Sequence, residues 1–255
     1  GPLGTGGALA NCSDIVSGTF ACFNGDIVSS LDVTPMIELH KRNGGIGTLA
    51  LWEVEDPTRF GIVGLDDNSR ITQFKEKPKK EEVFSNLINA GSYILEDDIF
   101  EIMPDGKHSI EREIFPLLAA EGKLNGMEFD GYFIDAGTPE SWSEGVQECI
   151  RKKRFSSGEI CGGSWFSNPM AKVTEGARVV GSMVEGNVSI GNSEVIESTI
   201  LSGSLVGDNS VLSACLIGRN ATIGSNCNLN GVVVDHNSII PPETIQIGGK
   251  WLSQE

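Results

Sequence analysis

An aliphatic side chain recurs at every fifth or sixth position through the last third of the chain, and a small or polar residue usually follows it. An α-helix requires a period of 3.6 and an exposed strand a period of 2, so this spacing indicates neither. It is typical of a coil of three short parallel strands, each pointing one aliphatic side chain into a shared core. The predicted inward positions are Val184, Ile190, Ile196, Leu201, Val206, Leu212, Ile217, Ile223, Leu229, Val234 and Ile240.

The repeat therefore predicts a left-handed parallel β-helix over residues 156–255, with a separate domain over residues 1–155 and Ser156–Pro169 as the linker. In the first domain, strand patterns alternate with helix patterns. Such alternation is typical of an α/β fold with a Rossmann-like, mixed or mainly parallel sheet and helices on both faces. The predicted strands are Thr19–Ile27, Ile46–Val54, Phe60–Leu65, Arg70–Lys75 and Leu87–Leu95, and the predicted helices include Leu31–Arg42, Ile110–Glu121 and Pro139–Lys153.

The net charge is strongly negative, because 35 acidic residues oppose 19 basic ones and give −16. Nucleic-acid binding requires basic stripes, so we expect no nucleic-acid partner. No apolar run approaches the ~20 residues that span a bilayer, and no signal peptide is visible, so we expect no membrane association. The six cysteines form no CxxC pair and have no histidine at ligand spacing. They predict buried thiols in a reducing cytoplasm.

Carboxylates follow two of the predicted strands. Asp26 ends the run Asn24-Gly25-Asp26, and Asp135 lies in the run FIDAGTP. Ligands of open α/β sheets bind beyond the carboxyl ends of the strands, and two aspartates on one Mg²⁺ are a recurrent arrangement in phosphoryl transfer. A plain turn remains the alternative for Asn24–Asp26, since these residue types are also the favoured turn residues.

Two further motifs have the composition of a phosphate site. FKEKP (Phe74–Pro78) places Glu76 and Lys77 at the end of a hairpin strand, where a cation could hold a phosphate. A solvated, lysine-rich turn is the alternative. The opening PLGTGGA (Pro2–Ala8) is predicted to be a Gly-rich loop whose backbone amides could approach a base or a phosphate closely.

In this order, PLGTGGA, FNGD, FKEKP, INAGSY (Ile88–Tyr93) and FIDAGTP, followed by the hexapeptide repeat, resemble the sugar-1-phosphate nucleotidylyltransferases. The resemblance runs from Pro2 to Pro242 and is strongest to mannose-1-phosphate guanylyltransferases and glucose-1-phosphate thymidylyl- or uridylyltransferases. It implies formation of an NDP-sugar and pyrophosphate from a nucleoside triphosphate and a sugar-1-phosphate, with Mg²⁺ as cofactor. The overall resemblance favours GTP and mannose-1-phosphate.

The resemblance also implies roles for individual residues. Asp26 and Asp135 match the two metal-binding aspartates, and Lys77 matches the lysine that neutralises the sugar phosphate, so these three are the expected catalytic residues. Substrate binding is expected from Pro2, Gly4, Thr5 and Gly7 at the base, and from Glu76, Asn89 and Gly91 at the sugar.

One family motif, a G-x-G-T-R-L loop around the triphosphate, does not occur in this sequence and would lie upstream of Pro2. We therefore expect an N-terminally truncated and inactive chain. A hexapeptide-repeat acyltransferase is an alternative, with His236 as the only histidine of the repeat available as a general base. A non-catalytic regulatory or assembly subunit is another. In each case the β-helix is expected to join subunits into a homo-oligomer.

Overall fold

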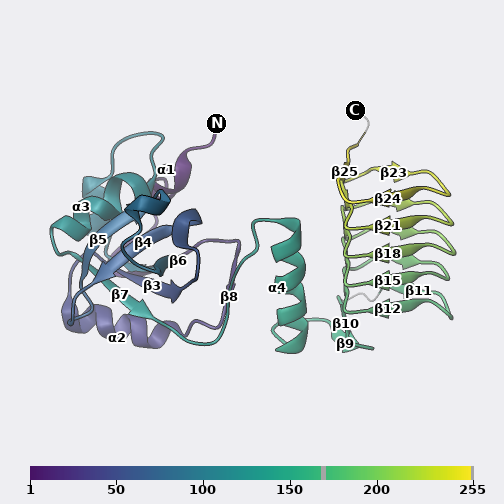
Figure 1. Cartoon of the computed structure of the whole chain (residues 1–255), viewed down its shortest axis with the longest axis horizontal. Coiled ribbons are helices and arrows are strands. Elements are labelled where there is room, and N and C mark those ends of the chain that lie inside the picture. Colours follow the sequence, from purple (N-terminus) through teal and green to yellow (C-terminus); the bar gives the residue numbers. More distant parts are fainter. Residues whose placement is uncertain (168–170, 254–255) are drawn as a thin grey trace. The chain divides into compact units, whose positions relative to one another are not determined.

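The computed structural model describes residues 1–167 and 171–253, and it divides into two compact units, Gly1–Phe133 and Ile134–Glu255. Figure 1 shows the order of the elements along the chain. The sequence placed the boundary between residues 155 and 156. That domain boundary stays a prediction, and the two compact units divide after Phe133 because the helix α4 (Pro139–Arg151) packs on the repeat domain.

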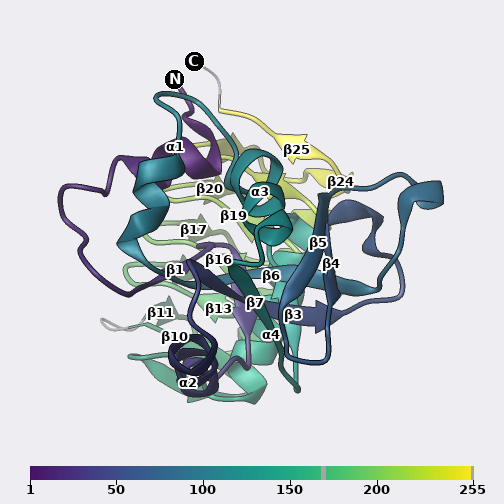
Figure 2. The same ribbon diagram turned by 90° about the vertical axis from the view of Figure 1, so that its left-hand side faces the viewer.

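The first unit is built on a mixed sheet of six strands (Figure 2). The strand order is β5 (Ile71–Glu76), β4 (Gly61–Leu65), β6 (Leu87–Leu95), β3 (Gly47–Glu53) and β7 (Leu124–Glu128), with β1 (Phe20–Phe23) also paired to β6. Among the described strands of this sheet only β3 and β7 pair in parallel. The predicted mixed α/β sheet is confirmed, and antiparallel pairs dominate it because short turns join neighbouring strands such as β4 and β5.

Helices cover both faces of this sheet (Figure 1). Side chains alternate along β3, so Leu49 and Leu51 enter the core under α3 (Phe115–Ala120), whereas Ala50 enters the core under α2 (Val33–Asn43). The helix α2 begins as predicted, since Asp32 caps it by accepting a hydrogen bond from the Thr34 N–H at 2.9 Å. Both cores depend on strands that are buried from two sides.

Two predicted elements of the first unit are interrupted. The predicted strand Thr19–Ile27 divides into β1 and β2 (Ile27–Ser29) around the Asn24 turn. The predicted helix Ile110–Glu121 divides into a single π-helical turn, Ile110–Ile114, and α3. Pro116 has no N–H to continue the helical ladder, and a widened turn accommodates that loss. The remaining short 3₁₀ helices are Pro57–Arg59, Lys80–Glu82 and Asp97–Ile102.

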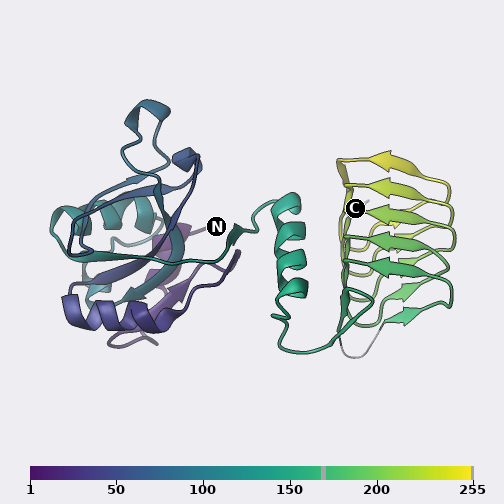
Figure 3. The same ribbon diagram turned by 60° about the horizontal axis from the view of Figure 1, so that its bottom comes forward.

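The second unit contains a parallel β-solenoid whose three sheets stack strand upon strand (Figure 3). One coil takes 16 or 17 residues, which is the separation of the residues that its hydrogen bonds join. The predicted parallel β-helix is confirmed, and its left-handedness stays a prediction. The first sheet holds β9 (Glu159–Cys161), β10 (Ser164–Phe166), β13 (Met183–Val184), β16 (Thr199–Ile200), β19 (Leu216–Ile217), β22 (Val233–Val234) and β25 (Lys250–Trp251). The second holds β11 (Lys172–Val173), β14 (Ser189–Ile190), β17 (Leu205–Val206), β20 (Thr222–Ile223) and β23 (Ile239–Ile240). The third holds β12 (Arg178–Val180), β15 (Glu194–Ile196), β18 (Val211–Ser213), β21 (Asn228–Asn230) and β24 (Ile245–Ile247).

The predicted linker Ser156–Pro169 is in part a hairpin, since β9 and β10 lie within it and pair antiparallel at the start of the first sheet. Its residues 168 and 169 lie outside the described residues. Trp165 explains why the segment is ordered. Its indole stacks on Phe155 with ring centroids 4.4 Å apart and donates to the Ser157 carbonyl at 2.8 Å.

The inward positions follow the predicted repeat except at two places. Ile196 and Leu201 are only half-buried, whereas the preceding residues, Val195 and Ile200, are fully buried. The coil from Ser182 to Ser198 spans 16 residues, one fewer than the next coil, so the core positions on β15 and β16 fall one residue earlier than predicted. Adjacent strand residues point to opposite faces, so a shift of one residue exchanges the buried and outward side chains.

Small residues two positions before the aliphatic ones close each corner of the solenoid. The Ser182 hydroxyl accepts from the Ser198 N–H at 3.1 Å, and the Ser198 hydroxyl accepts from the Cys215 N–H at 3.0 Å. These hydroxyls satisfy buried backbone donors that would otherwise be costly. Cys215 and Cys227 occupy the same kind of position and are buried, as predicted for the thiols, although Cys161 is exposed.

The helix α4 packs on the outer face of the first solenoid sheet and runs alongside the strand stack (Figure 3). Its Val146 packs against Trp165 and Met183, and the Trp142 indole donates to the Thr199 hydroxyl at 3.1 Å. Such burial explains why the helix belongs to the second unit. Within the described residues, none of the helices combines the length and apolar character that crossing a bilayer demands.

Neighbouring isoleucines in β23 test the solenoid register. Ile240 is fully buried and Ile239 is 70% exposed. We expect Ile240→Asp to lower the free energy of unfolding by several kcal/mol, because it buries an unpaired carboxylate. We expect Ile239→Asp to change it by less than about 0.5 kcal/mol. Chemical denaturation followed by circular dichroism measures both, and equal effects would contradict the register.

Candidate functional site

The Gly-rich start of the chain forms the helix α1 (Gly4–Ala10) instead of the predicted loop. The N–H groups of Gly6 and Gly7 donate to the His108 carbonyl oxygen at 3.1 and 3.3 Å. A Cβ on Gly6 would lie 2.2 Å from the His108 ring, and one on Gly4 would lie 2.3 Å from the His108 oxygen. The glycines therefore permit close packing of α1 on the segment 106–111. The predicted contact of Pro2, Gly4 and Gly7 with a base stays a prediction.

Thr5 connects α1 to a buried carboxylate. Its hydroxyl donates to Glu111 Oε2 at 2.5 Å and accepts from the Ile110 N–H at 3.1 Å. The Ser109 hydroxyl donates to the same oxygen, Oε2, at 2.7 Å. Glu111 is only 8% exposed, so these two hydroxyls replace the water that a carboxylate requires.

The strand β6 carries the predicted sugar-contacting residues. The Asn89 side chain accepts from the Gly91 N–H at 3.1 Å and donates to the Tyr93 hydroxyl at 2.9 Å. Gly91 has φ +68, and a Cβ there would lie 2.7 Å from the Asn24 side-chain nitrogen. Its carbonyl accepts from the Asn24 N–H at 2.8 Å. Only glycine fits this kink, which brings the turn that contains Asp26 against β6.

Glu76 and Lys77 lie at the end of β5, as predicted. The Glu76 side chain is 15% exposed and the Lys77 side chain 57%, and Lys77 Nζ lies 4.0 Å from Glu76 Oε1. Burial raises the pKa of Glu76, and the charge of Glu111 raises it further. Gly61 is opposite Glu76 in the sheet, and a Cβ there would lie 2.7 Å from Glu76 Oε2. The backbone therefore leaves room for this carboxylate on β5.

Sequence reasoning missed Glu111 and Tyr93. Tyr93 is 2% exposed, and burial followed by the charge of Glu111 raises the pKa of its hydroxyl, which stays protonated at neutral pH. Burial is the largest cause of the raised pKa of Cys22, and the charges of Cys12 and then of Glu111 raise it further. The Glu111 charge thus acts on Glu76, Tyr93 and Cys22 together. The one faint signal for Glu111 is Ser109 followed by two acidic residues at a predicted helix start, which is also an ordinary capping pattern.

The first unit therefore has a wall of acceptors, which we call the carboxylate wall: Glu76, Glu111, Asn89 and Tyr93, with the exposed ammonium of Lys77 at its side. Two carboxylates in partly buried surroundings favour a ligand that donates several hydrogen bonds. A polyhydroxyl compound does so. The adjacent ammonium adds attraction for a phosphate on the same ligand.

Asp26 and Asp135 belong to different compact units. Asp26 lies in the exposed turn between β1 and β2, and Asp135 ends β8 (Phe133–Asp135), where it accepts from the Gly137 N–H at 3.1 Å. Each can offer carboxylate oxygens, the ligands that Mg²⁺ takes, so the chemistry of each fits the predicted metal. Within the described residues, three or more His, Cys, Asp or Glu side chains nowhere form a ready metal cluster.

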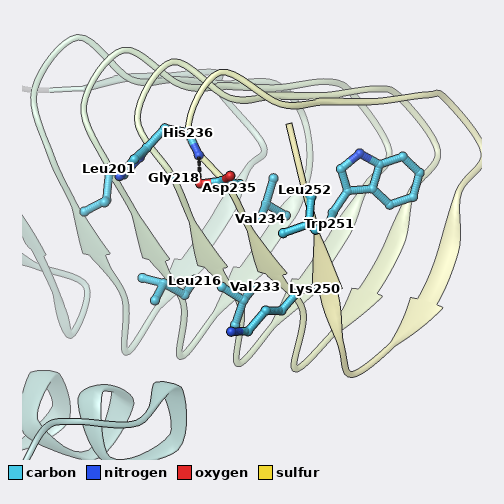
Figure 4. Close-up of a pocket in the computed structure, with 10 residues that line it drawn as sticks. All are labelled: Leu201, Leu216, Gly218, Val233, Val234, Asp235, His236, Lys250, Trp251 and Leu252. Carbon is cyan, nitrogen blue, oxygen red and sulfur yellow. Dashed lines mark hydrogen bonds between the residues drawn. The ribbon is translucent and has the colours of Figure 1, made fainter. Parts of the chain in front are cut away.

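The solenoid has its own surface pocket, of about 290 Å³, beside His236 (Figure 4). Leu216, Val233 and Lys250 also line it. His236 Nδ1 accepts from the Arg219 N–H at 2.8 Å. The proton of the neutral ring therefore resides on Nε2, which makes the exposed nitrogen a donor. A general base requires a free lone pair, so this geometry argues against the acyltransferase alternative.

Comparison with known proteins matches both parts of the chain. A model of the nucleotidyl transferase family matches residues 1–152, and a model of the GlmU-like C-terminal hexapeptide region matches residues 169–251.

Individual relatives match across both parts. A mannose-1-phosphate guanylyltransferase catalytic subunit beta of Drosophila pseudoobscura pseudoobscura is 31% identical over 97% of this chain and 69% of its own length. The mannose-1-phosphate guanylyltransferase catalytic subunit beta of Danio rerio is 31% identical over 97% of this chain and 72% of its own length. A mannose-1-phosphate guanylyltransferase of Mycobacterium tuberculosis is 35% identical over 86% of this chain and 61% of its own length.

The charge of Glu111 gives a direct test of the carboxylate wall. We expect Glu111→Gln to lower the pKa of Glu76, because the substitution removes the negative charge and leaves burial unchanged. Titration of ¹³C-labelled glutamate carboxyls by NMR measures the change. Glu113→Gln is the matched control on the neighbouring exposed carboxylate. An unchanged Glu76 pKa in Glu111→Gln would separate the two carboxylates and contradict the shared wall.

Proposed function

The chain belongs to the nucleotidyl transferase family, and we propose that it transfers a nucleotidyl group from a nucleoside triphosphate to a sugar-1-phosphate. The relatives' names support GTP and mannose-1-phosphate as the pair of substrates. The observation that carries the proposal is the carboxylate wall beside Lys77, which combines acceptors for hydroxyls with a cation for phosphate.

In the proposed reaction, a phosphate oxygen of the sugar-1-phosphate attacks the α-phosphorus of the nucleoside triphosphate. A new P–O bond forms, the bond between the α-phosphorus and the bridging oxygen breaks, and pyrophosphate leaves with that oxygen. No covalent intermediate with the protein is required. The side chains contribute position and charge neutralisation, which suffice for phosphoryl-type transfer.

The sugar is the substrate for which the described residues offer most. Its hydroxyls would donate to Glu76 and Glu111, while Asn89 and Tyr93 hold one edge of the strand in place through their mutual hydrogen bond. A ligand with several donors offsets the burial and the repulsion from Glu111 that together raise the pKa of Glu76. Lys77, with its ammonium mostly in solvent, can meet the phosphate of the same molecule.

Mg²⁺ is part of the proposal through Asp26 and Asp135, and when bound it supplies charge neutralisation for the phosphates. Each aspartate would offer carboxylate oxygens to the ion, and water would complete the coordination of the ion. Neither residue is buried, so both side chains can take part in binding without first breaking a core contact.

Homo-oligomer formation through the solenoid, a cytoplasmic location and the need for an upstream G-x-G-T-R-L loop remain proposals. A non-catalytic subunit of the same fold is the competing function. Turnover of a panel of nucleoside triphosphates with sugar-1-phosphates distinguishes the two. It should be measured on this chain and on a form extended by any coding sequence that precedes Gly1. Absence of turnover in both forms would favour the non-catalytic subunit.

The metal-binding aspartates should control the chemical step. In a form that turns over, we expect Asp26→Asn and Asp135→Asn each to lower kcat by at least about a hundredfold, because the amide cannot neutralise the metal charge. The thermal midpoint should change little, since neither side chain is buried. Asp130→Asn, at an exposed position, is the control. A normal kcat in either variant would remove that aspartate from the site.

Lys77 should act mainly on substrate affinity. We expect Lys77→Ala to raise the KM for the sugar-1-phosphate by about tenfold or more, because its charge meets the phosphate before the transition state forms. Lys79→Ala is the matched control on the same lysine-rich segment, where the side chain is also exposed. Steady-state kinetics with the sugar-1-phosphate varied decides. A selective fall in kcat with unchanged KM would assign Lys77 to the chemical step instead.

A further inference from the structure

We infer that Thr5 is a positioning residue for Glu111: its hydroxyl fixes which carboxylate oxygen faces the sugar. The inference rests on the proposed function and concerns specificity within the carboxylate wall. It assigns Thr5 a role other than the base contact that the sequence predicted.

The direction of the Thr5 hydroxyl is fixed by its own contacts. Its oxygen accepts from the Ile110 N–H at 3.1 Å, so its proton is left to point toward Glu111 Oε2 at 2.5 Å. The Ser109 hydroxyl repeats this pattern, because it accepts from the Arg112 N–H at 3.2 Å and donates to Oε2 at 2.7 Å. Two hydroxyl donors with backbone-fixed directions therefore converge on one oxygen.

The other oxygen of Glu111 is left for a ligand. Both hydroxyls donate to Oε2. Oε1 has no hydrogen-bond partner within the described residues, and it is not one of the unpaired polar atoms there that are buried away from solvent. It therefore keeps contact with solvent. The π-helical turn that holds Glu111 packs on β5, the strand that ends in Glu76, and Ile110 and Ile114 of that turn share a core with Tyr93. This packing locates the carboxylate beside the proposed sugar site.

The position of Thr5 is set by backbone packing over several residues. Gly6 and Gly7 donate to the His108 carbonyl oxygen, and the His108 N–H donates to the Leu3 carbonyl at 3.1 Å. A side chain on Gly6 would displace the His108 ring. The glycines thus hold the Thr5 hydroxyl within reach of Glu111. Without the Thr5 hydroxyl, Ser109 would be the one remaining side-chain donor to Glu111 Oε2 among the described residues.

The alternative is that Thr5 merely satisfies a buried carboxylate and stabilises the fold. A structural role of that kind would change stability without changing selectivity for the ligand. A positioning role predicts that the loss of the hydroxyl affects the ligand only when the Glu111 carboxylate is present. A double-mutant cycle separates the two.

The test uses the whole chain, α-D-mannose-1-phosphate as the probe and isothermal titration calorimetry. We expect Thr5→Val, which keeps the shape and removes the hydroxyl, to weaken binding by about tenfold. Thr5→Ser should recover most of the affinity, because it restores the donor. Thr72→Val is the control, since that hydroxyl donates only to the Gly64 carbonyl on an exposed part of β5. The ¹³C chemical shift of the Glu111 side-chain carboxyl, measured at a fixed neutral pH, should change in Thr5→Val and not in Thr5→Ser, because only the valine removes the hydrogen bond to Oε2.

The cycle with Glu111→Gln gives the decisive outcomes. Thr5→Val should add less than a twofold loss in the Glu111→Gln background. Wild-type affinity in Thr5→Val, or a full additional loss in that background, would overturn the inference. If Glu111→Gln itself binds as the wild type does, or the wild type does not bind, the proposed sugar site is wrong. The ¹³C shift of the Glu111 carboxyl still decides whether Thr5 holds the carboxylate in that case.

Discussion

The pairing of β6 with three neighbouring strands is the constraint on which the first unit depends. β6 bonds β1, β3 and β4, and its side chains enter both cores, with Tyr93 and Leu95 on one face and Ala90 and Ile94 on the other. A strand held from both edges and both faces has little freedom to move. The kink at Gly91 is therefore held in one conformation. It fixes the position of the Asn24 turn, which bonds to the Gly91 carbonyl, and of the hydrogen bond between Asn89 and Tyr93.

Periodicity predicted the solenoid because each coil repeats the same physical requirement, one aliphatic side chain per strand and a small residue at each corner. The error at Ile196 and Leu201 shows the limit of that reasoning. The sequence around them offers two adjacent aliphatic residues at both core positions, so composition cannot choose between them. The length of the coil chooses, and that length is fixed by corner hydrogen bonds such as Ser198 to Ser182.

The candidate site was predictable where short motifs carry it and unpredictable where distant segments meet. Glu76, Lys77 and Asn89 were proposed because their motifs resemble a family; the family match confirms the resemblance, and the roles of these residues stay predictions. Glu111 was missed because its partner Thr5 lies 106 positions away. The Gly-rich start was misread for the same reason. Glycines that admit a phosphate and glycines that admit the His108 ring look alike in a sequence.

The carboxylate wall has a physical cost that explains its form. Burial and the neighbouring charge of Glu111 both disfavour the ionised form of Glu76 and raise its pKa, so the empty site has an electrostatic cost. Glu111 offsets that cost with two hydroxyl donors, whereas Glu76 keeps partial exposure and a lysine at 4.0 Å. A ligand that donates to both carboxylates offsets the remaining electrostatic cost. Part of its binding free energy would then come from relief of that cost. A net charge of −16 does not conflict with the proposed anionic sugar phosphate, because the ammonium of Lys77, and not the overall charge, would face the phosphate.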